Sequence, residues 1–223
     1  MGLDMPLGAL AGLLVLFVAG QAAAARLDVK VTSDAAALPD AVISLHGSSP
    51  ATAVKATASM DQRDMAFVPG VLPIQAGTRV VFPNSDQVRH QVYSFSEARR
   101  FELPLYAGTP AEPVLFERAG VVVVGCNIHD WMIGHIVVLD SPHFAKSNVD
   151  GEVRMDVPAG RYRLQVWHPR LRGDPIEREL ELVDGDGRIE VIELALAPPP
   201  PPRQGSDRLR ALQEKFRGQK PRP

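Results

Sequence analysis

Short apolar alternations, each ended by Gly, Pro, Asn or Asp, fill most of the chain from residue 27 to about residue 140. Helical periodicity is nearly absent here, whereas many short strands separated by turn residues are typical of a β-sandwich or β-barrel. The expected strands cover residues 27–31, 41–46, 78–82, 88–95, 114–117, 120–124 and 133–140. The sequence therefore predicts an all-β fold for this region.

A second and smaller β region follows from residue 141 to residue 197. Turn residues at 150–151 and 158–160 border two stretches in which apolar and polar side chains alternate. The apolar positions are Val153, Met155 and Val157, then Tyr162, Leu164 and Val166. A period of two indicates half-buried strands, so residues 141–197 are predicted to form a separate β module.

The N-terminal segment has the pattern of a secretory signal peptide. Residues 7–19 are apolar or small, and the four alanines at 22–25 suit a cleavage site near Ala25. This run is short of the roughly 20 apolar residues that span a bilayer. Residues 1–25 are therefore predicted to direct export to a bacterial periplasm. Asp4 and the lack of Lys or Arg before the run leave an uncleaved anchor or a mis-assigned start codon as alternatives.

The C-terminal segment, residues 198–223, reads as a linker followed by a basic tail. Five prolines at 198–202 favour an extended spacer. Leu209, Leu212 and Phe216 then recur at helical spacing, and the tail from Arg203 onward has seven basic and two acidic residues. We expect the tail to be mostly solvated, because an isolated helix of this length is marginal in water, with contact to a membrane surface or a partner through its basic residues as the alternative.

Charge and cysteine content narrow the classes of function. Lys and Arg number 24 against 26 Asp and Glu, so the chain lacks the basic field expected of a nucleic-acid-binding protein. A single cysteine, Cys126, cannot form an internal disulfide. With six histidines present, it could be a nucleophile, a metal ligand or a packing residue.

The segment from Cys126 to Met132 carries the densest chemical signal. Cys126, His129 and Met132 place a thiol, an imidazole and a thioether within seven residues, between two apolar strands. A loop of this length can turn all three toward one centre. His90 lies on another expected strand and shares a face with two valines, so it points inward as a further ligand or as a hydrogen-bonded core histidine.

This donor set suits copper. Two histidines, one cysteine and a weak axial thioether form a trigonal site that favours one-electron chemistry, whereas a thioether adds little for zinc. His135 competes with Met132 for the fourth position, although strand alternation puts Met132 on the other face. His46, His143 and His168 have no second donor near them in the sequence and are expected to be unrelated to the site.

The chain resembles the cupredoxins over residues 26–140. The resemblance rests on residues 77–84, His90 and a Cys-x₂-His-x₂-Met loop like that of amicyanin. It implies a Greek-key β-sandwich and one mononuclear copper ion that alternates between Cu(I) and Cu(II). His90, Cys126 and His129 would be strong ligands and Met132 the axial one. The whole chain is similar to exported plastocyanin-like proteins of the methylamine-utilisation type.

Two positions depart from that family pattern. Gln91 follows the first histidine where the family usually has Asn, and Arg89 precedes it where Pro is usual. The bracing around the ligands is therefore expected to differ. Residues 141–197 are in turn similar to carboxypeptidase-regulatory-like, or transthyretin-like, β-sandwiches, which implies an accessory role.

The sequence thus predicts a periplasmic type 1 copper protein that carries single electrons between redox partner proteins. A copper-binding or copper-delivery protein without a redox circuit is the alternative. We expect the protein not to be an enzyme. A cysteine-histidine nucleophilic enzyme is disfavoured, because Cys126 and His129 have neither an orienting third group nor an oxyanion feature in the sequence around them.

Overall fold

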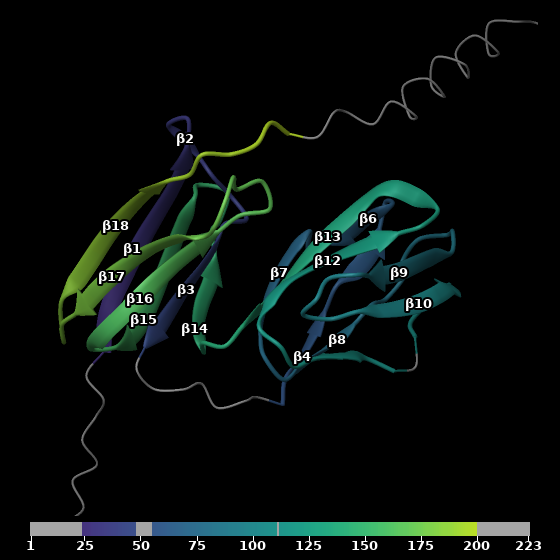
Figure 1. Cartoon of the computed structure of the whole chain (residues 1–223), viewed down its shortest axis with the longest axis horizontal. Coiled ribbons are helices and arrows are strands. Elements are labelled where there is room, and N and C mark those ends of the chain that lie inside the picture. Colours follow the sequence, from purple (N-terminus) through teal and green to yellow (C-terminus); the bar gives the residue numbers. More distant parts are fainter. Residues whose placement is uncertain (1–23, 48–54, 111, 200–223) are drawn as a thin grey trace, which may run out of the picture.

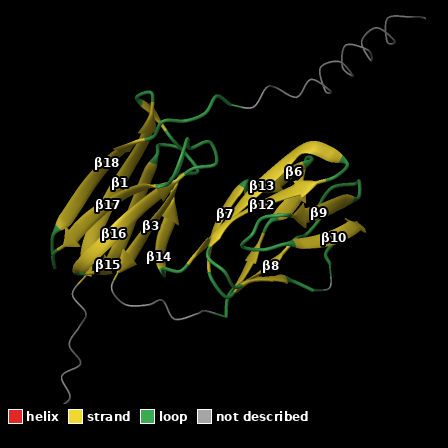
Figure 2. Ribbon diagram, in the orientation of Figure 1, coloured by secondary structure: helices red, strands yellow, loops and turns green. Residues whose placement is uncertain are grey.

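The computed structural model describes residues 24–47, 55–110 and 112–199. All regular elements of this part are strands, and they form two β-sandwiches (Figures 1 and 2). The predicted all-β fold is confirmed. Within the described part, no element is a helix with the length and apolarity that a membrane crossing requires.

The first sandwich is built from both ends of the described chain. One sheet has the order β15-β1-β18, with β2 added beside β1, and its strands are β1 (Ala24–Ser33), β2 (Ala36–Ala37), β15 (Glu152–Pro158) and β18 (Gly187–Glu193). The facing sheet has the order β14-β3-β16-β17, with strands β3 (Val42–Gly47), β14 (His143–Lys146), β16 (Gly160–Trp167) and β17 (Ile176–Leu182).

The alternation of buried and exposed side chains along the strands explains how the two sheets of this sandwich share one core. Along β1 every second residue is buried, and these residues join the predicted apolar positions of β15 and β16 in one core, which includes Leu27, Val29, Leu45, Met155 and Leu164. The strands at 27–31 and 41–46, expected in the first domain, instead pair with strands of residues 141–197. The remaining strands, residues 57–139, are therefore inserted between β3 and β14. The transthyretin-like relation of the first sandwich stays a prediction.

The second sandwich covers residues 57–139. Its larger sheet has the order β10-β9-β12-β13-β7, with strands β7 (Val71–Gln75), β9 (His90–Ser94), β10 (Phe101–Tyr106), β12 (Gly120–Cys126) and β13 (His129–Leu139). The smaller sheet has the order β11-β8-β4, with strands β4 (Thr57–Ser59), β8 (Thr78–Val81) and β11 (Val114–Phe116). A hairpin of β5 (Asp61–Arg63) and β6 (Ala66–Val68) completes it.

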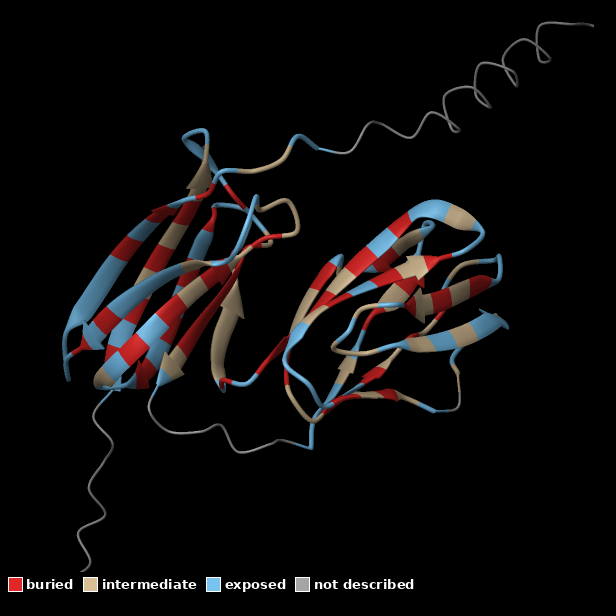
Figure 3. Ribbon diagram, viewed as in Figure 1, coloured by how far each residue is buried: buried red, intermediate tan, exposed pale blue. Residues whose placement is uncertain are grey.

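The core of the second sandwich is rich in aromatic and branched residues. Phe82 and Phe116 are fully buried with Met60, Val122 and Ile136. Bands of buried and exposed residues alternate along β12 and β13 in Figure 3, as expected for strands with one face in a core. Cys126 and Met132 belong to this same buried cluster.

The two sandwiches touch through a small apolar cluster. Val42 of the first sandwich packs with Val71, Val137 and Leu139 of the second, and Trp167 lies against this cluster. The ring centroids of Trp167 and His135 are 5.8 Å apart. A face of β13 thus contacts the first sandwich while the other face lines the core of the second.

Two terminal predictions fall mainly on residues outside this description. The predicted signal peptide lies outside the described residues apart from Ala24 and Ala25, which begin β1 and pair with β15. The predicted basic tail lies outside them as well, beyond residue 199. Both assignments stay predictions.

Candidate metal centre

Cys126 is the last residue of β12 and is buried. Strands β12 and β13 pair in antiparallel register from Gly120 opposite Val138 to Gly125 opposite Ile133. The register then shifts, so that Cys126 lies opposite His129 and only two residues separate the strands. The predicted hairpin is confirmed, and Cys126 points into the core because it shares the buried face of β12 with Val122 and Val124.

His90 begins the neighbouring strand β9 and has no exposed surface. Val92 and Ser94 are buried on the same face, as the alternation predicts, whereas Val88 precedes the strand and is exposed. Strand β9 pairs with β12 through Tyr93 and Gly125. This pairing brings His90 beside Cys126.

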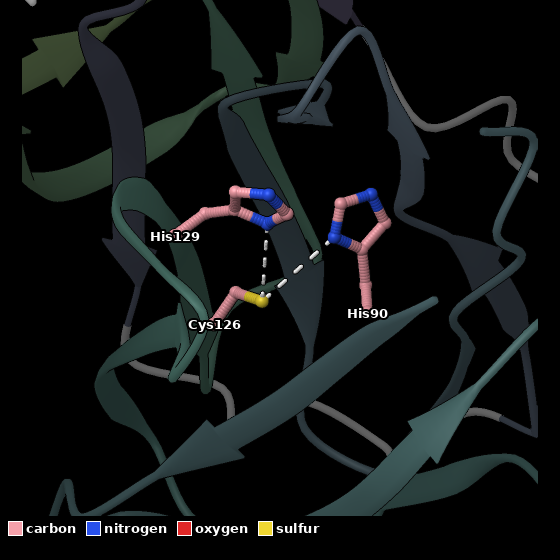
Figure 4. A group of neighbouring side chains, drawn as sticks. All are labelled: His90, Cys126 and His129. Atoms are coloured by element: carbon pink, nitrogen blue, oxygen red, sulfur yellow. Dashed lines mark hydrogen bonds between the residues drawn. The ribbon is translucent and has the colours of Figure 1, made fainter. Parts of the chain in front are cut away.

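The three strong predicted ligands converge (Figure 4). The sulfur of Cys126 lies 3.8 Å from Nδ1 of His90 and 3.8 Å from Nδ1 of His129. The three potential ligand atoms all lie within 4.8 Å of one another. Among the described residues, this is the one group of three His, Cys, Asp or Glu side chains with that geometry.

Asp86 fixes the orientation of the His90 ring. Its Oδ2 atom lies 2.7 Å from Nε2 of His90. A carboxylate can only accept hydrogen bonds, so Nε2 carries the proton and Nδ1 presents its lone pair toward the cluster. Such an outer partner fixes the tautomer of a metal-binding histidine and raises its basicity.

Asp86 is itself held by backbone amides of the β5–β6 turn. It accepts hydrogen bonds from the amides of Asp64 at 2.7 Å and Met65 at 2.9 Å. Burial acts to raise the pKa of Asp86, but the hydrogen bonds from Met65, His90 and Asp64 together hold it below its ordinary value. Asp86 therefore remains an anion beside the ligand.

Asn84 braces the segment that leads to His90. Its Nδ2 atom donates to the carbonyls of Val88 and Tyr106, each at 2.9 Å, and its Oδ1 atom accepts from the amide of Asp86 at 3.0 Å. Gln91 donates instead to Glu102, away from the ligands. The bracing around His90 therefore differs from the family pattern, as expected. Asn84 and Asp86, and not Gln91, hold the segment and the ring of His90 in place.

Tyr106 stabilises the start of the same segment through hydrogen bonds of its hydroxyl group. Its hydroxyl donates to the carbonyl of Phe82 at 2.7 Å and accepts from Nε2 of Gln62. Burial raises the pKa of Tyr106 to about 12. Neither Gln62 nor Tyr106 was indicated by the sequence, because their role depends on contacts between distant strands.

His129 is the ligand nearest to solvent. It is partly exposed, and its ring centroid lies 4.9 Å from that of His90 and 5.2 Å from that of Trp131. Burial lowers the pKa of His129, and the neighbouring His90 adds to the effect while Asp86 opposes it. The neutral imidazole that a metal requires is therefore favoured here.

Met132 and His135 occupy opposite faces of β13, as alternation predicts. Met132 is buried in the same cluster as Cys126, whereas His135 packs against Trp167 at the contact with the first sandwich. His135 is accordingly absent from the three-residue group. Coordination by the Met132 sulfur stays a prediction.

The remaining histidines lie outside this centre. His143 packs against the ring of Tyr162, and His168 accepts a hydrogen bond from the amide of Arg170. His46 contacts Ser44 and Asp140. Their separation from the cluster agrees with the sequence, although one partner of His46, Asp140, is far from it in the chain.

The donor set fits a transition ion. One thiolate and two imidazoles within a shared coordination distance match the trigonal arrangement that copper adopts. His90 and Cys126 are buried and His129 is partly exposed, and a set of donors that is already aligned limits rearrangement when an ion is bound. The cluster is therefore a potential copper site made by His90, Cys126 and His129.

No protein-family model and no curated protein matches this chain. Among solved structures, it is similar to a purple cupredoxin from Nitrosopumilus maritimus, with 24% identity over 37% of this chain and 99% of that chain and a TM-score of 0.33. A reduced amicyanin variant is 20% identical over 44% of this chain and 98% of its own, with a TM-score of 0.35.

A copper-containing nitrite reductase from Thermus scotoductus SA-01 is 27% identical, with a TM-score of 0.35, over 39% of this chain and 22% of its own. The all-β fold and the His-Cys-His cluster confirm the cupredoxin-like character predicted for the second sandwich.

Proposed function

We propose that this protein is an exported type 1 copper protein that carries single electrons between redox partners. The observation that carries the proposal is the convergence of Cys126 with the Nδ1 atoms of His90 and His129. Copper bound there supplies the one-electron change between Cu(I) and Cu(II). The buried thioether of Met132 is proposed as the weak axial ligand.

The surrounding residues favour electron transfer because they hold the ligands in one geometry. His90 is fixed by Asp86, and the segment before it is fixed by Asn84 and Tyr106. Copper(I) and copper(II) prefer different ligand arrangements, and a rigid intermediate one reduces the change required on electron transfer. A site for copper delivery would gain little from this bracing, because it must release its ion.

The route for the electron runs through the side of the site nearest to solvent. His129 is partly exposed and lies beside Trp131, which is exposed as well. The ring edge of His129 is therefore the proposed point where a partner approaches. The opposite ligand, His90, is sealed inside the sandwich.

Location and partners belong to the same proposal. The apolar N-terminal run and small residues near Ala25 support export to the periplasm, where soluble redox proteins would be the donor and acceptor. The basic tail beyond Arg203 is proposed to contact a partner or a membrane surface. No substrate chemistry is assigned to the metal centre itself.

Voltammetry of the purified, copper-loaded protein tests electron transfer directly. The proposal predicts a reversible one-electron couple and rapid reoxidation of the reduced protein by a small inorganic oxidant. The delivery alternative predicts that a copper(I) chelator removes the ion readily and that the couple is irreversible. The second result would overturn the redox assignment while leaving copper binding in place.

A further inference from the structure

A second group of polar side chains lies between the two sandwiches, away from the metal centre. The hydroxyl oxygen of Ser44 is 2.9 Å from Nε2 of His46. On the other side of the same ring, Nδ1 of His46 is 2.9 Å from Oδ1 of Asp140. Serine, histidine and carboxylate thus form one continuous chain of hydrogen bonds.

The fold brings these residues together from different sandwiches. Along β3, Ile43 and Leu45 enter the first core, so Ser44 and His46 face the opposite way, toward the second sandwich. Asp140 directly follows the last residue of β13, which belongs to the second sandwich. The group therefore exists only when both sandwiches are in contact.

The hydrogen-bond pattern sets the position of each proton. A carboxylate oxygen accepts hydrogen bonds, so the tautomer of His46 that suits both contacts has its proton on Nδ1, toward Asp140, and its lone pair on Nε2, toward Ser44. The hydroxyl of Ser44 then donates to Nε2. This is the polarity required of a serine nucleophile, a histidine general base and a carboxylate that orients the base.

These three residues line a cavity of about 310 Å³. Val137 and Trp167 supply apolar surface to it, while Arg163 and Gln165 add hydrogen-bond donors. The side chain of Asp140 is 70% exposed, so solvent reaches the cavity at that end. A concave site with apolar walls and a few convergent polar groups is the usual form of a small-molecule site.

Two side chains with N–H donors lie on the strand next to the serine and the histidine. In the antiparallel register of β3 and β16, Gln165 lies directly opposite Ser44 and Arg163 opposite His46. The amide of Gln165 and the guanidinium of Arg163 each donate to Glu177, at 2.6 Å and 3.1 Å. Each group retains further N–H donors for another acceptor.

We propose that this cavity is a hydrolytic site for small carboxylic esters. The oxygen of Ser44 bonds to the ester carbonyl carbon as its proton passes to Nε2 of His46. The ester C–O bond then breaks, and His46 returns the proton to the departing alcohol. Water adds to the acyl group on Ser44 with the same histidine as base, which releases the carboxylic acid and restores the serine hydroxyl.

Labelling with a fluorophosphonate, followed by peptide mass spectrometry, tests the proposal on the full chain. Ser44 is expected to be the modified residue, and p-nitrophenyl acetate hydrolysis is expected to fall to the background rate in Ser44→Ala. Ser85→Ala is the matched control, because Ser85 is exposed and donates to Asp61 without a histidine partner. This control is expected to keep wild-type labelling and hydrolysis.

Asp140→Asn provides a variant that preserves the fold, because its side chain is largely exposed. It is expected to slow both labelling and hydrolysis at least about tenfold, since the histidine loses the partner that sets its tautomer. Wild-type protein that is labelled at other residues only, or that hydrolyses the ester no faster than Ser44→Ala, would overturn the proposal. These results do not depend on the assignment of the metal centre.

Discussion

Oδ2 of Asp86 lies 2.7 Å from Nε2 of His90, and the same carboxylate accepts hydrogen bonds from two backbone amides of the turn between β5 and β6. The buried ligand histidine is thus tied to a hairpin that contributes no ligand. The carboxylate selects the tautomer of His90 that presents Nδ1 to the sulfur of Cys126. Removing it should alter metal binding without removing a ligand.

Asp86→Ala is expected to lower copper affinity about 10 to 100-fold, because the orientation and basicity of His90 depend on the carboxylate. Competition with a chelator of known affinity measures the change. Asp61→Ala is the control, since Asp61 accepts from Arg63 and Ser85 and does not contact His90. Equal losses of affinity in the two variants would show that Asp86 has no specific role at the ligand.

Met132→Leu tests the proposed axial ligand. Leucine conserves the buried volume, so we expect a stability cost of less than about 1.5 kcal/mol. Loss of the thioether should shift the reduction potential and the visible spectrum, whereas His135→Gln should leave both near their wild-type values. Voltammetry and absorption spectra of the two variants decide the point. A shift in His135→Gln alone would identify the histidine as the fourth ligand.

Tyr106→Phe is expected to cost about 1–3 kcal/mol at neutral pH, because the carbonyl of Phe82 loses its donor. The pKa of Tyr106 is raised to about 12 in the folded chain. Its contribution is therefore complete below the unfolded value near 10 and declines as the pH rises toward 12.

Denaturant unfolding of both proteins at a series of pH values measures this dependence. The stability difference between wild type and Tyr106→Phe should shrink above about pH 10. A difference that stays constant to pH 12 would contradict the raised pKa of the buried Tyr106 hydroxyl.

Shortened chains test how the two sandwiches are connected. Residues 55–140 contain the complete second core and all proposed ligands, so they are expected to fold and bind copper alone. Residues 141–199 alone are expected to remain unfolded, because β1 and β3 are central strands of the two sheets of the first sandwich. Circular dichroism and thermal unfolding check both outcomes, and cooperative unfolding of residues 141–199 would contradict the strand pairing.

Local patterns in the sequence were sufficient to predict much of the arrangement of the metal centre. The apolar strands on both sides of residues 126–132 indicated the hairpin, and the alternation around His90 indicated its burial. Alternation also separated Met132 from His135. Each of these features depends on a few neighbouring residues, which is why the sequence alone was informative.

Contacts between distant segments were not predictable in the same way. Strands with the same alternation can join either sandwich. No local sequence pattern therefore showed that residues 27–31 and 41–46 pair with strands that follow residue 141. Short polar strands such as β5 have only a weak apolar pattern, so the sequence did not indicate that Gln62 donates a hydrogen bond to Tyr106. The pairing of His46 with Asp140 likewise follows from packing between sandwiches.

Metal analysis with visible spectroscopy of the copper-loaded protein tests the central claim most directly. We expect one copper ion per chain and an intense thiolate-to-copper band in the red part of the spectrum, with that band lost in Cys126→Ser. A protein that binds no stoichiometric copper, or whose copper spectrum is the same in Cys126→Ser, would contradict a site built on Cys126, His90 and His129.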